Sequence, residues 1–297
     1  MPFYIPPTYK TKFWRWYLAI LVVAAVVVWA SVAQAPDKLL HFYALNIGQG
    51  DSLYIKLPDG KDILIDGGPD DNVLEELGRV MPFYDHELDL VVATHNHSDH
   101  ISGLVDVFKH YRVKEIWLTG AVHNTRTFSD WLEAVKDEQD EDAKVVKIQA
   151  GHHKDFDGVT FDTLFPLADY EGKRPQDQHD ATIVAKMRYG DINFLLTGDL
   201  NEGHEAQILA AEKDILRAQI LKVPHHGSAT GLSNEFLEAV SPKVAIISVG
   251  AHNAFHHPAP SIIKKLADRA IKTLRTDRNG RVEVATDGIT YSVKSEQ

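Results

Sequence analysis

Three histidines and an aspartate fall within the six residues from His95 to His100. They follow a mostly apolar run, residues 88–93, that predicts a buried strand, and they precede a predicted helix. Because alternate residues of an extended chain face the same way, His95 and His97 can reach one point. The turn into the helix then brings Asp99 and His100 toward a second point nearby. Imidazole and carboxylate groups at this density indicate a site for zinc or a similar divalent ion.

Later strand ends carry further ligand types. The apolar run 194–196 leads through Thr-Gly to Asp199, and the run 220–224 leads to His225 and His226. The end of a buried strand is a suitable position for a metal-bridging aspartate or a ligand histidine. Two earlier segments, residues 46–52 and 64–68, likewise contain glycines and an aspartate near apolar residues.

The order of these motifs resembles that of the metallo-β-lactamase superfamily. It is most similar to the metallohydrolase domain attached to the DNA-uptake channel ComEC and to free-standing relatives of that domain. The resemblance covers about residues 41 to 293. The motifs that carry it are Gly-Gln-Gly-Asp-Ser at 48–52, Ile-Asp-Gly-Gly at 65–68, His-x-His-x-Asp-His at 95–100, Leu-Thr-Gly-Asp at 196–199, Pro-His-His-Gly-Ser at 224–228 and Arg-Thr-Asp at 275–277.

The resemblance implies a binuclear metal centre. The first two histidines of the motif, His95 and His97, would bind one metal. Asp99 and His100 match ligands of the other metal, and Asp199 matches the bridging carboxylate. The implied cofactors are two divalent metal ions, with zinc expected and manganese as the other candidate. Two such ions about 3.5–4 Å apart stabilise both the attacking and the leaving oxygen, and they lower the pKa of a bound water to about 7, so that metal-bound hydroxide is available.

Two positions in this implied site stay open. Relatives of the lactamase type have a ligand histidine shortly before the hairpin that leads to the bridging aspartate, and His179 stands there. The ComEC pattern has Asn-x-Ser at this place, where this chain has Asp180-Ala-Thr, so His179, Asp180 or neither contributes. In many members of the superfamily the ligand histidine is followed directly by Gly or Asp, and this resemblance favours His226 as the ligand and His225 as a phosphate contact or proton donor. The exchanged assignment is the alternative.

Two further residues receive roles outside the ligand set. Asp66 resembles the early aspartate of the superfamily, which supports the ligand histidines without binding metal. His257, in a His-His-Pro segment, is expected to contact substrate, with a surface loop histidine as the alternative. The predicted site residues are therefore Asp99 and His225 for catalysis, and His95, His97, Asp99, His100, His179, Asp199 and His226 for metal, with Asp66 and His257 around them.

Strands and helices are expected to alternate in two similar halves, which predicts two stacked mixed sheets with helices outside. This agrees with the αββα four-layer sandwich that the resemblance implies. The acidic run 137–142 is expected to be a solvated helix end and turn. The predicted strands are 41–45, 52–56, 62–65, 88–93, 113–118, 145–148, 159–164, 183–188, 192–196, 219–223, 244–249, 282–285 and 290–293. The predicted helices are 74–80, 103–111, 127–138, 202–212, 234–240 and 261–270.

The N-terminal residues are expected to lie outside this domain. Lys10, Lys12 and Arg15 precede a long, mostly apolar run, which predicts a transmembrane helix over 16–34 with residues 1–15 in the cytoplasm. A linker over 35–40 would lead to the hydrolase domain, residues 41–297. Ala33-Gln34-Ala35 resembles a signal-peptidase site, but Pro36 disfavours cleavage, so an uncleaved anchor is expected.

The composition of the chain limits which functions are compatible with it. The chain has 297 residues, 44% of them hydrophobic, which suffices for one large domain and an appendage. A formal net charge of −11 argues against a surface built for indiscriminate DNA binding, although a local basic groove is compatible with it. Cysteine is absent, so no thiolate can bind metal.

We therefore expect a membrane-anchored, extracytoplasmic, binuclear metal-dependent hydrolase. The expected substrate is a phosphodiester, with DNA as one candidate. The alternatives are a hydrolase of a small ester, a lactone or an envelope phosphodiester, and a non-catalytic binding module that keeps the fold.

Overall fold

The computed structural model describes residues 7–33 and 37–296, which divide into two units between Asp37 and Lys38. The first unit is helix α1 (Pro7–Ala33). Residues 16–33 of the predicted span are helical, as expected. They contain neither Pro nor Gly, the residues that most disfavour a helix interior. Residues 1–6 of the expected cytoplasmic segment, and residues 34–36 at the helix end and linker, lie outside the described residues.

Within the described part of the chain, no helix has both the length and the apolar character needed to cross a membrane. The structure therefore does not support the predicted transmembrane span.

The first sheet of the second unit has eight strands, antiparallel from β17 to β3 and parallel from β3 to β8. In spatial order they are β17 (Tyr291–Ser295), β16 (Val282–Thr286), β1 (Leu40–Ala44), β2 (Leu53–Lys56), β3 (Asp62–Ile65), β5 (Leu90–Val92), β7 (Glu115–Leu118) and β8 (Lys144–Lys147). Beside this sheet, β4 (Glu87–Leu88) and β6 (Arg112–Val113) form a short parallel pair.

The second sheet has seven strands, parallel from β15 to β12 and antiparallel from β12 to β9. They are β15 (Lys272–Arg275), β14 (Val244–Ile247), β13 (Ile220–Lys222), β12 (Ile192–Leu196), β11 (Val184–Tyr189), β10 (Val159–Phe165) and β9 (His153–Phe156). A two-residue turn at Gly190-Asp191 joins β11 to β12.

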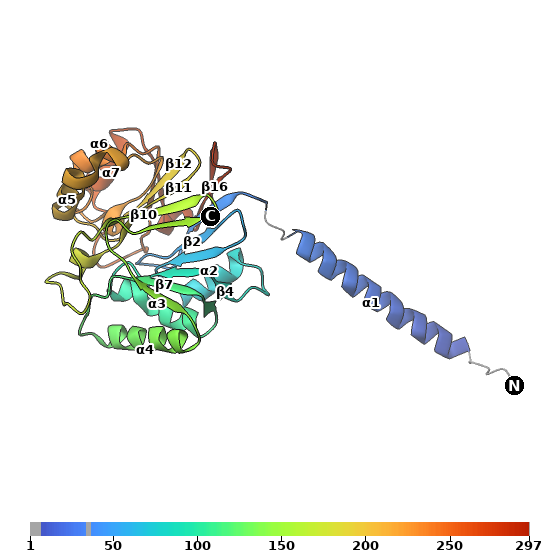
Figure 1. Ribbon diagram of the computed structural model, residues 1–297. Helices are drawn as coiled ribbons and strands as arrows, with labels where there is room; N and C mark the ends of the chain where they lie inside the picture. The colour runs from blue at the N-terminus through green and yellow to red at the C-terminus, as the bar shows by residue number, and fades with distance from the viewer. Residues whose placement is uncertain (1–6, 34–36, 297) are drawn as a thin grey trace. The chain divides into compact units, whose positions relative to one another are not determined.

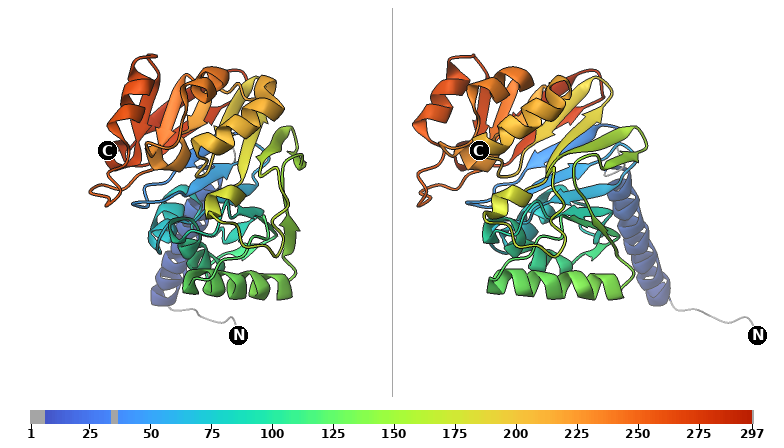
Figure 2. Two further views of the ribbon diagram at one scale, coloured as in Figure 1. Left: turned by 90° about the vertical axis from the view of Figure 1, so that its left-hand side faces the viewer. Right: turned by 60° about the vertical axis from the view of Figure 1, so that its left-hand side comes forward.

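Helices cover the outer face of each sheet, and the two sheets pack face to face (Figures 1 and 2). Phe42, Trp117 and Phe194 belong to the apolar core between the sheets. The predicted αββα sandwich is confirmed. The helices over the first sheet are α2 (Asn72–Val80), α3 (Ser98–Phe108) and α4 (Arg126–Asp140). Those over the second are α5 (Glu202–Glu212), α6 (Asn234–Val240) and α7 (Pro260–Ala267).

The structure also differs locally from the predicted elements. Helix α3 begins at Ser98 rather than Gly103, so two of the predicted ligands lie in its first turn. Glu138, expected to be solvated, is buried and accepts a hydrogen bond from the Val113 amide at 3.0 Å. Elements that were not predicted are β9, β15, the helical turn α8 (Thr276–Asn279) and three 3₁₀ turns, η1 (Gln178–Ala181), η2 (Lys213–Ile215) and η3 (Pro224–Gly227).

Candidate metal centre

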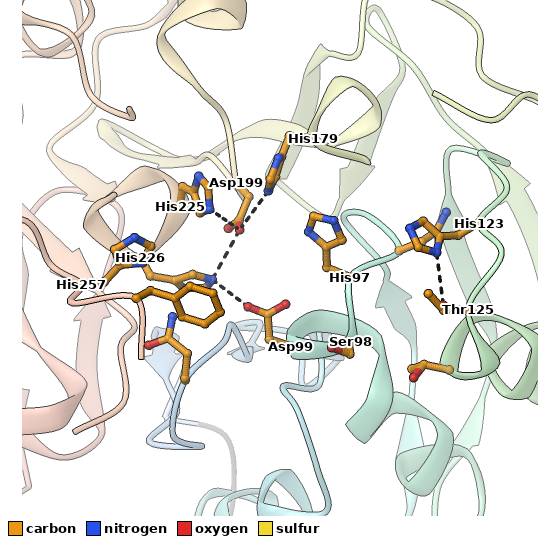
Figure 3. A pocket seen from close by; sticks show the side chains of 14 residues that line it. His97, Ser98, Asp99, His123, Thr125, His179, Asp199, His225, His226 and His257 are labelled. Carbon is orange, nitrogen blue, oxygen red and sulfur yellow. Dashed lines mark hydrogen bonds and ion pairs between the residues drawn. The ribbon is translucent and has the colours of Figure 1, made fainter. Parts of the chain in front are cut away.

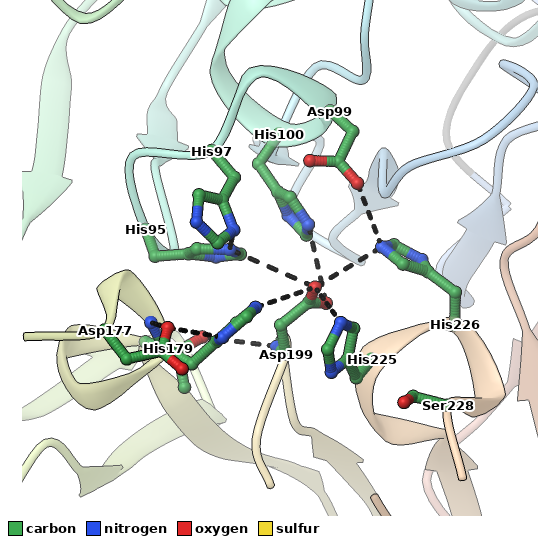
Figure 4. A network of polar contacts seen from close by, with 12 residues as sticks. His95, His97, Asp99, His100, Asp177, His179, Asp199, His225, His226 and Ser228 are labelled. Carbon is green, nitrogen blue, oxygen red and sulfur yellow. Dashed lines mark hydrogen bonds and ion pairs between the residues drawn. The ribbon is translucent and has the colours of Figure 1, made fainter. Parts of the chain in front are cut away.

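The predicted ligand residues come from four separate segments, each placed just beyond a strand or in a short turn. Three follow the carboxyl ends of β5, β12 and β13, and the fourth is η1; the supporting residue Asp66 follows β3. Strand ends at one edge of an α/β sheet are where ligands bind, because loops from several strands meet there. Figure 4 shows side chains of these segments pointing toward one another around Asp199.

One group of donors is His95, His97 and His179, whose ligand atoms lie within 4.8 Å of one another. Nε2 of His95 is 3.0 Å from Nδ1 of His97. Nδ1 of His179 pairs with the Asp177 carboxylate at 2.6 Å, which leaves Nε2 of His179 to face the group. Three imidazole nitrogens directed at one point form a donor set that zinc commonly takes.

A second group is Asp99, His100 and His226, with ligand atoms again within 4.8 Å of one another. Asp99 and His100 lie in the first turn of α3, and His226 lies in η3. Nε2 of His226 is 3.3 Å from Oδ2 of Asp99. This group has two imidazoles and one carboxylate, which also suit a divalent transition metal.

Asp199 lies between the two groups and is buried. Its Oδ2 is 4.0 Å from Nε2 of His95 and 3.8 Å from Nε2 of His179. Toward the second group, Oδ1 of Asp199 is 3.4 Å from Nε2 of His100, and Oδ2 is 3.4 Å from Nε2 of His226. A carboxylate in this position can bridge two ions.

Buried partners fix the orientation of the ligand histidines. Asp66 accepts from Nδ1 of His100 at 2.7 Å, from the Thr94 amide at 2.8 Å and from the Thr94 hydroxyl at 2.7 Å. Nδ1 of His226 donates to the Ser248 carbonyl at 3.0 Å. Each contact directs Nε2 of the histidine into the centre, as carboxylate and carbonyl partners do in metal sites.

Unsatisfied polar atoms test whether the residues fit a metal. Nε2 of His100, Nε2 of His226 and Oδ1 of Asp199 are buried and have no hydrogen-bond partner among the described residues. Such atoms are costly to bury unless something compensates them. All three face the gap between the groups, where a divalent cation would satisfy them. The donor set around these atoms therefore fits a divalent metal ion.

The electrostatics of the site point the same way. Burial and the neighbouring imidazoles lower the pKa of His97 to about 4 and hold that of His95 well below its usual range, so both are neutral, the form that binds metal. Burial opposes charge on His100 and His226, but the Asp199 carboxylate and its acidic neighbours raise the pKa of both histidines well above the usual value. These carboxylates therefore require positive charge in the centre.

His225 and His226 have consecutive left-handed backbone conformations, with φ of 48° and 52°. This conformation costs non-glycine residues about 1–2 kcal/mol each. The His225 amide donates to the Gly198 carbonyl at 3.1 Å, which ties the turn to the loop that carries Asp199. The turn directs His226 into the second group, whereas His225 remains partly exposed, with its Nε2 3.8 Å from Oδ2 of Asp199.

A cavity of about 390 Å³ opens over the centre (Figure 3). Asp99, His225 and His257 line it, as does His123, to which the sequence assigned no role. The rings of His225 and His257 have centroids 5.6 Å apart. The geometry thus places His257 at the cavity, and it places both residues predicted to be catalytic where a substrate can reach them.

The structure brings nearly all of the predicted site residues together. It directs His179 into the centre, whereas Asp180 contacts Nε2 of His204 at 3.0 Å instead. Sequence reasoning missed Asp51 and Lys222, a buried ion pair behind His226 in which Oδ1 of Asp51 is 3.5 Å from Nδ1 of His226. A lysine within the apolar strand 220–223 was the signal that could have revealed this pair.

Comparison with known proteins identifies the family. The profile of the Metallo-beta-lactamase superfamily matches residues 45–252. The chain belongs to this superfamily. Among curated proteins, it is 29% identical to ComE operon protein 3 of Bacillus subtilis over 80% of this chain and 32% of that protein. It is 27% identical to competence protein ComA of Neisseria gonorrhoeae over 89% of this chain and 35% of that protein. The predicted resemblance to the ComEC-type domain is confirmed, and the chain spans about a third of these relatives' length.

Solved structures share the fold at low identity. Tm1679, a metal-dependent hydrolase of the β-lactamase superfamily, superposes with a TM-score of 0.54 at 13% identity, covering 83% of this chain and 100% of that one. CmlA, a diiron β-hydroxylase from Streptomyces venezuelae, gives 0.50 at 12% identity over 80% of this chain and 52% of that one. Because these two proteins differ in activity, the reaction must be argued from the site itself.

Proposed function

We propose that this chain is a binuclear metal-dependent phosphodiesterase that acts on nucleic acid. The observation that carries the proposal is a pair of three-residue donor groups with the Asp199 carboxylate within 4.0 Å of histidines of both, beside a cavity that Asp199 lines. Bound there, two divalent ions would activate water and neutralise charge on the phosphoryl oxygens. The names of the relatives that match, a competence protein and a ComE operon protein, support nucleic acid as the substrate class.

The cavity residues then have separate roles. His95, His97 and His179 would hold one ion, and Asp99, His100 and His226 the other, with Asp199 between them. Asp99 faces the cavity and can also orient the attacking water. Burial lowers the pKa of His225 to about 4, so its imidazole is neutral at neutral pH and must accept a proton before it can donate one. His225 would take up that proton from solvent and deliver it to the leaving oxygen.

Metal content and hydrolysis test the proposal. The hydrolase domain should bind close to two divalent ions per chain, measured by elemental analysis, and should hydrolyse bis-p-nitrophenyl phosphate when loaded with zinc or manganese. Asp199→Ala should lose at least one ion and most of the rate, because both donor groups contact this carboxylate. If the reconstituted domain binds no stoichiometric metal, the proposed enzyme function is refuted. If Asp199→Ala keeps both ions and the full rate, the proposed bridging role of Asp199 is refuted.

A smaller phosphodiester is the second candidate, and one observation favours it. None of the described residues that line the cavity is lysine or arginine, and the net charge of the chain is −11. A long DNA strand normally gains much of its affinity from such cations. Comparing rates on single-stranded DNA, on dinucleotides and on envelope-type diesters such as glycerophosphodiesters separates the two.

We also propose, from the sequence, that the hydrolase domain lies outside the cytoplasmic membrane. Support comes from Lys10, Lys12 and Arg15 before the apolar run, and from the exposed apolar side chains along α1, such as Leu18 (63%) and Val23 (62%). Protease added to the outer face of the sealed membrane should digest the domain. If the domain is digested only after lysis, the opposite orientation is correct. If the protein is recovered in the fraction that is not membrane-bound, the proposed membrane attachment is wrong.

A further inference from the structure

The cavity has an aromatic edge that the proposed chemistry does not use. Phe255 lines the cavity, although its side chain is 65% exposed. Its ring is stacked on that of His257, with centroids 5.7 Å apart and 27° between the planes. Because His257 is in turn close to His225, the aromatic edge continues to the centre where the phosphate would react.

Hydrogen bonds fix the loop that carries Phe255. The Asn253 side chain donates to the Gly250 carbonyl at 3.0 Å and to the His257 carbonyl at 2.7 Å, and it accepts from the His257 amide at 2.9 Å. The Gly250 amide donates to Oε1 of Gln49 at 3.1 Å, which ties the loop to the turn before β2. A loop held in place before binding loses little conformational entropy when a ligand stacks on one of its side chains.

Gln49 adds an unused donor to the same cavity. Its Oε1 is occupied by the Gly250 amide, but its Nε2 is buried and has no hydrogen-bond partner among the described residues. A buried donor of this kind favours a ligand that brings an acceptor. The cavity therefore presents an aromatic face and an amide donor.

We propose that Phe255, His257 and Gln49 form a nucleobase subsite beside the metal centre. The base of a nucleotide next to the reacting phosphate stacks on Phe255, and a ring carbonyl or nitrogen of the base accepts from Gln49. A lipid tail would leave the Gln49 donor unpaired, and a quaternary ammonium group brings no acceptor. Since none of the described lining residues is a lysine or arginine that could contact neighbouring phosphates, stacking would add affinity for a nucleotide beyond that of the metal centre. The inference rests on the proposed phosphodiesterase function and names its substrate more closely.

Dinucleotides that lack one base test the subsite. We would measure kcat/KM of the metal-loaded full chain on thymidylyl-thymidine and on two analogues with a tetrahydrofuran residue in place of the 5′ or the 3′ nucleoside. One analogue should react about 5- to 150-fold more slowly than the parent, the range expected for loss of one stacked base. Phe255→Ala should slow the parent by a similar factor and abolish its advantage over that analogue.

Matched variants provide the controls. Phe255→Tyr keeps an aromatic face and should retain the preference, and Phe83→Ala, which removes a 78% exposed ring that does not line the cavity, should not alter it. If Phe255→Ala changes all three dinucleotides equally or none of them, the subsite is refuted while the phosphodiesterase stands. If the wild type hydrolyses no diester, the proposed function fails. The affinities of the same three ligands, measured by calorimetry, then test the subsite separately. A higher affinity for the parent dinucleotide that is lost in Phe255→Ala would support the subsite. Equal affinities for the three ligands would refute it.

Discussion

His225 and His226 are adjacent in the chain but lie in different surroundings. His226 is buried, with Nδ1 held by the Ser248 carbonyl and Nε2 facing Asp99 and Asp199. His225 lines the cavity and is partly exposed. Two consecutive left-handed residues make this divergence possible, since they turn the backbone sharply between the two side chains. Substituting a metal ligand and substituting a proton carrier should therefore have different effects on metal content and rate.

We expect His226→Ala to lower metal content and rate together, because the second donor group loses an imidazole. His225→Ala should keep both ions and lower the rate by roughly 10²–10⁴-fold on substrates with poor leaving groups. The loss should shrink on p-nitrophenyl esters, whose leaving group needs little protonation. Elemental analysis and rates on both kinds of diester measure this. Loss of metal in His225→Ala alone would invert the assignment.

At the scale of elements, strand β13 contributes support behind the centre as well as the turn that holds His226. Lys222, at the end of this strand, is buried, and its ammonium group contacts the Asp51 carboxylate and the Gly198 carbonyl, the latter at 3.2 Å. Asp51 in turn lies 3.5 Å from Nδ1 of His226. The ion pair thus joins β13, the turn before β2 and the loop before Asp199.

Lys222→Met should leave the Asp51 carboxylate buried without its cation, which costs about 3–5 kcal/mol of unfolding free energy. Because Asp51 also contacts His226, we expect the affinity for the second ion to fall about 10- to 100-fold. Lys56→Met breaks the Lys56–Asp62 pair elsewhere in the domain and should lower stability without changing metal affinity. Denaturant unfolding and metal titration distinguish the two variants; unchanged metal affinity in Lys222→Met would show that the pair is only structural.

The first turn of α3 is positioned by a close approach between backbones. The Gly67 amide donates to the His100 carbonyl at 2.7 Å, and the Gly103 amide donates to the Gly68 carbonyl at 3.0 Å. A Cβ atom on Gly103 would lie 2.0 Å from the Gly67 carbonyl oxygen. Only glycine at 103 therefore allows the helix to place Asp99 and His100 against the Asp66 loop.

Gly103→Ala should force α3 away from that loop and destabilise the domain by about 1–3 kcal/mol or more, with a loss of metal affinity. Gly78 in α2 is the matched control, because a Cβ there meets nothing within 4 Å. Gly78→Ala should raise stability by about 0.5–1 kcal/mol through helix propensity. Thermal unfolding with and without zinc compares them. A Gly103→Ala protein with wild-type stability and metal affinity would contradict the packing argument.

At the scale of the whole molecule, the charge distribution restricts how nucleic acid can bind. The chain has 42 acidic and 31 basic residues, and the cavity lining, as far as the structure describes it, includes neither lysine nor arginine. Contact with a strand should therefore be confined to the nucleotides at the metal centre rather than follow the strand along a basic groove.

Affinity for single-stranded DNA should accordingly depend weakly on salt and on length. Each contacted phosphate contributes a slope of about −0.7 in a plot of log K against log salt concentration, so we expect a total slope of about −1 to −2. Affinity should stop rising beyond roughly three nucleotides. Fluorescence anisotropy with metal-loaded His225→Ala, which should keep both ions and react slowly, measures both quantities over oligonucleotides of increasing length. A steep slope that grows with length would reveal a basic track outside the cavity.

Local patterns in the sequence sufficed for the fold class, for most elements and for the predicted ligands between His95 and His100. Strand β12, helix α5 and helix α6 have the predicted bounds, because periodicity and turn residues act over a few neighbours. The start of α3 was misplaced because its position depends on Gly67 and Gly68, which are distant in sequence. Strands β9 and β15 were missed because they are four-residue edge strands with mixed polarity, fixed by pairing with β10 and β14.

The sequence by itself determined which residue types stand at the strand ends, and therefore the kind of chemistry available. Only the tertiary structure decided which of them meet. It directs His179 inward and Asp180 toward His204, and it pairs Lys222 with Asp51 across the fold. The directions of neighbouring side chains depend on backbone dihedrals, which distant hydrogen bonds fix. Partners far apart in the chain are brought together by packing. Neither the dihedrals nor the packing partners can be predicted from the spacing of nearby residues.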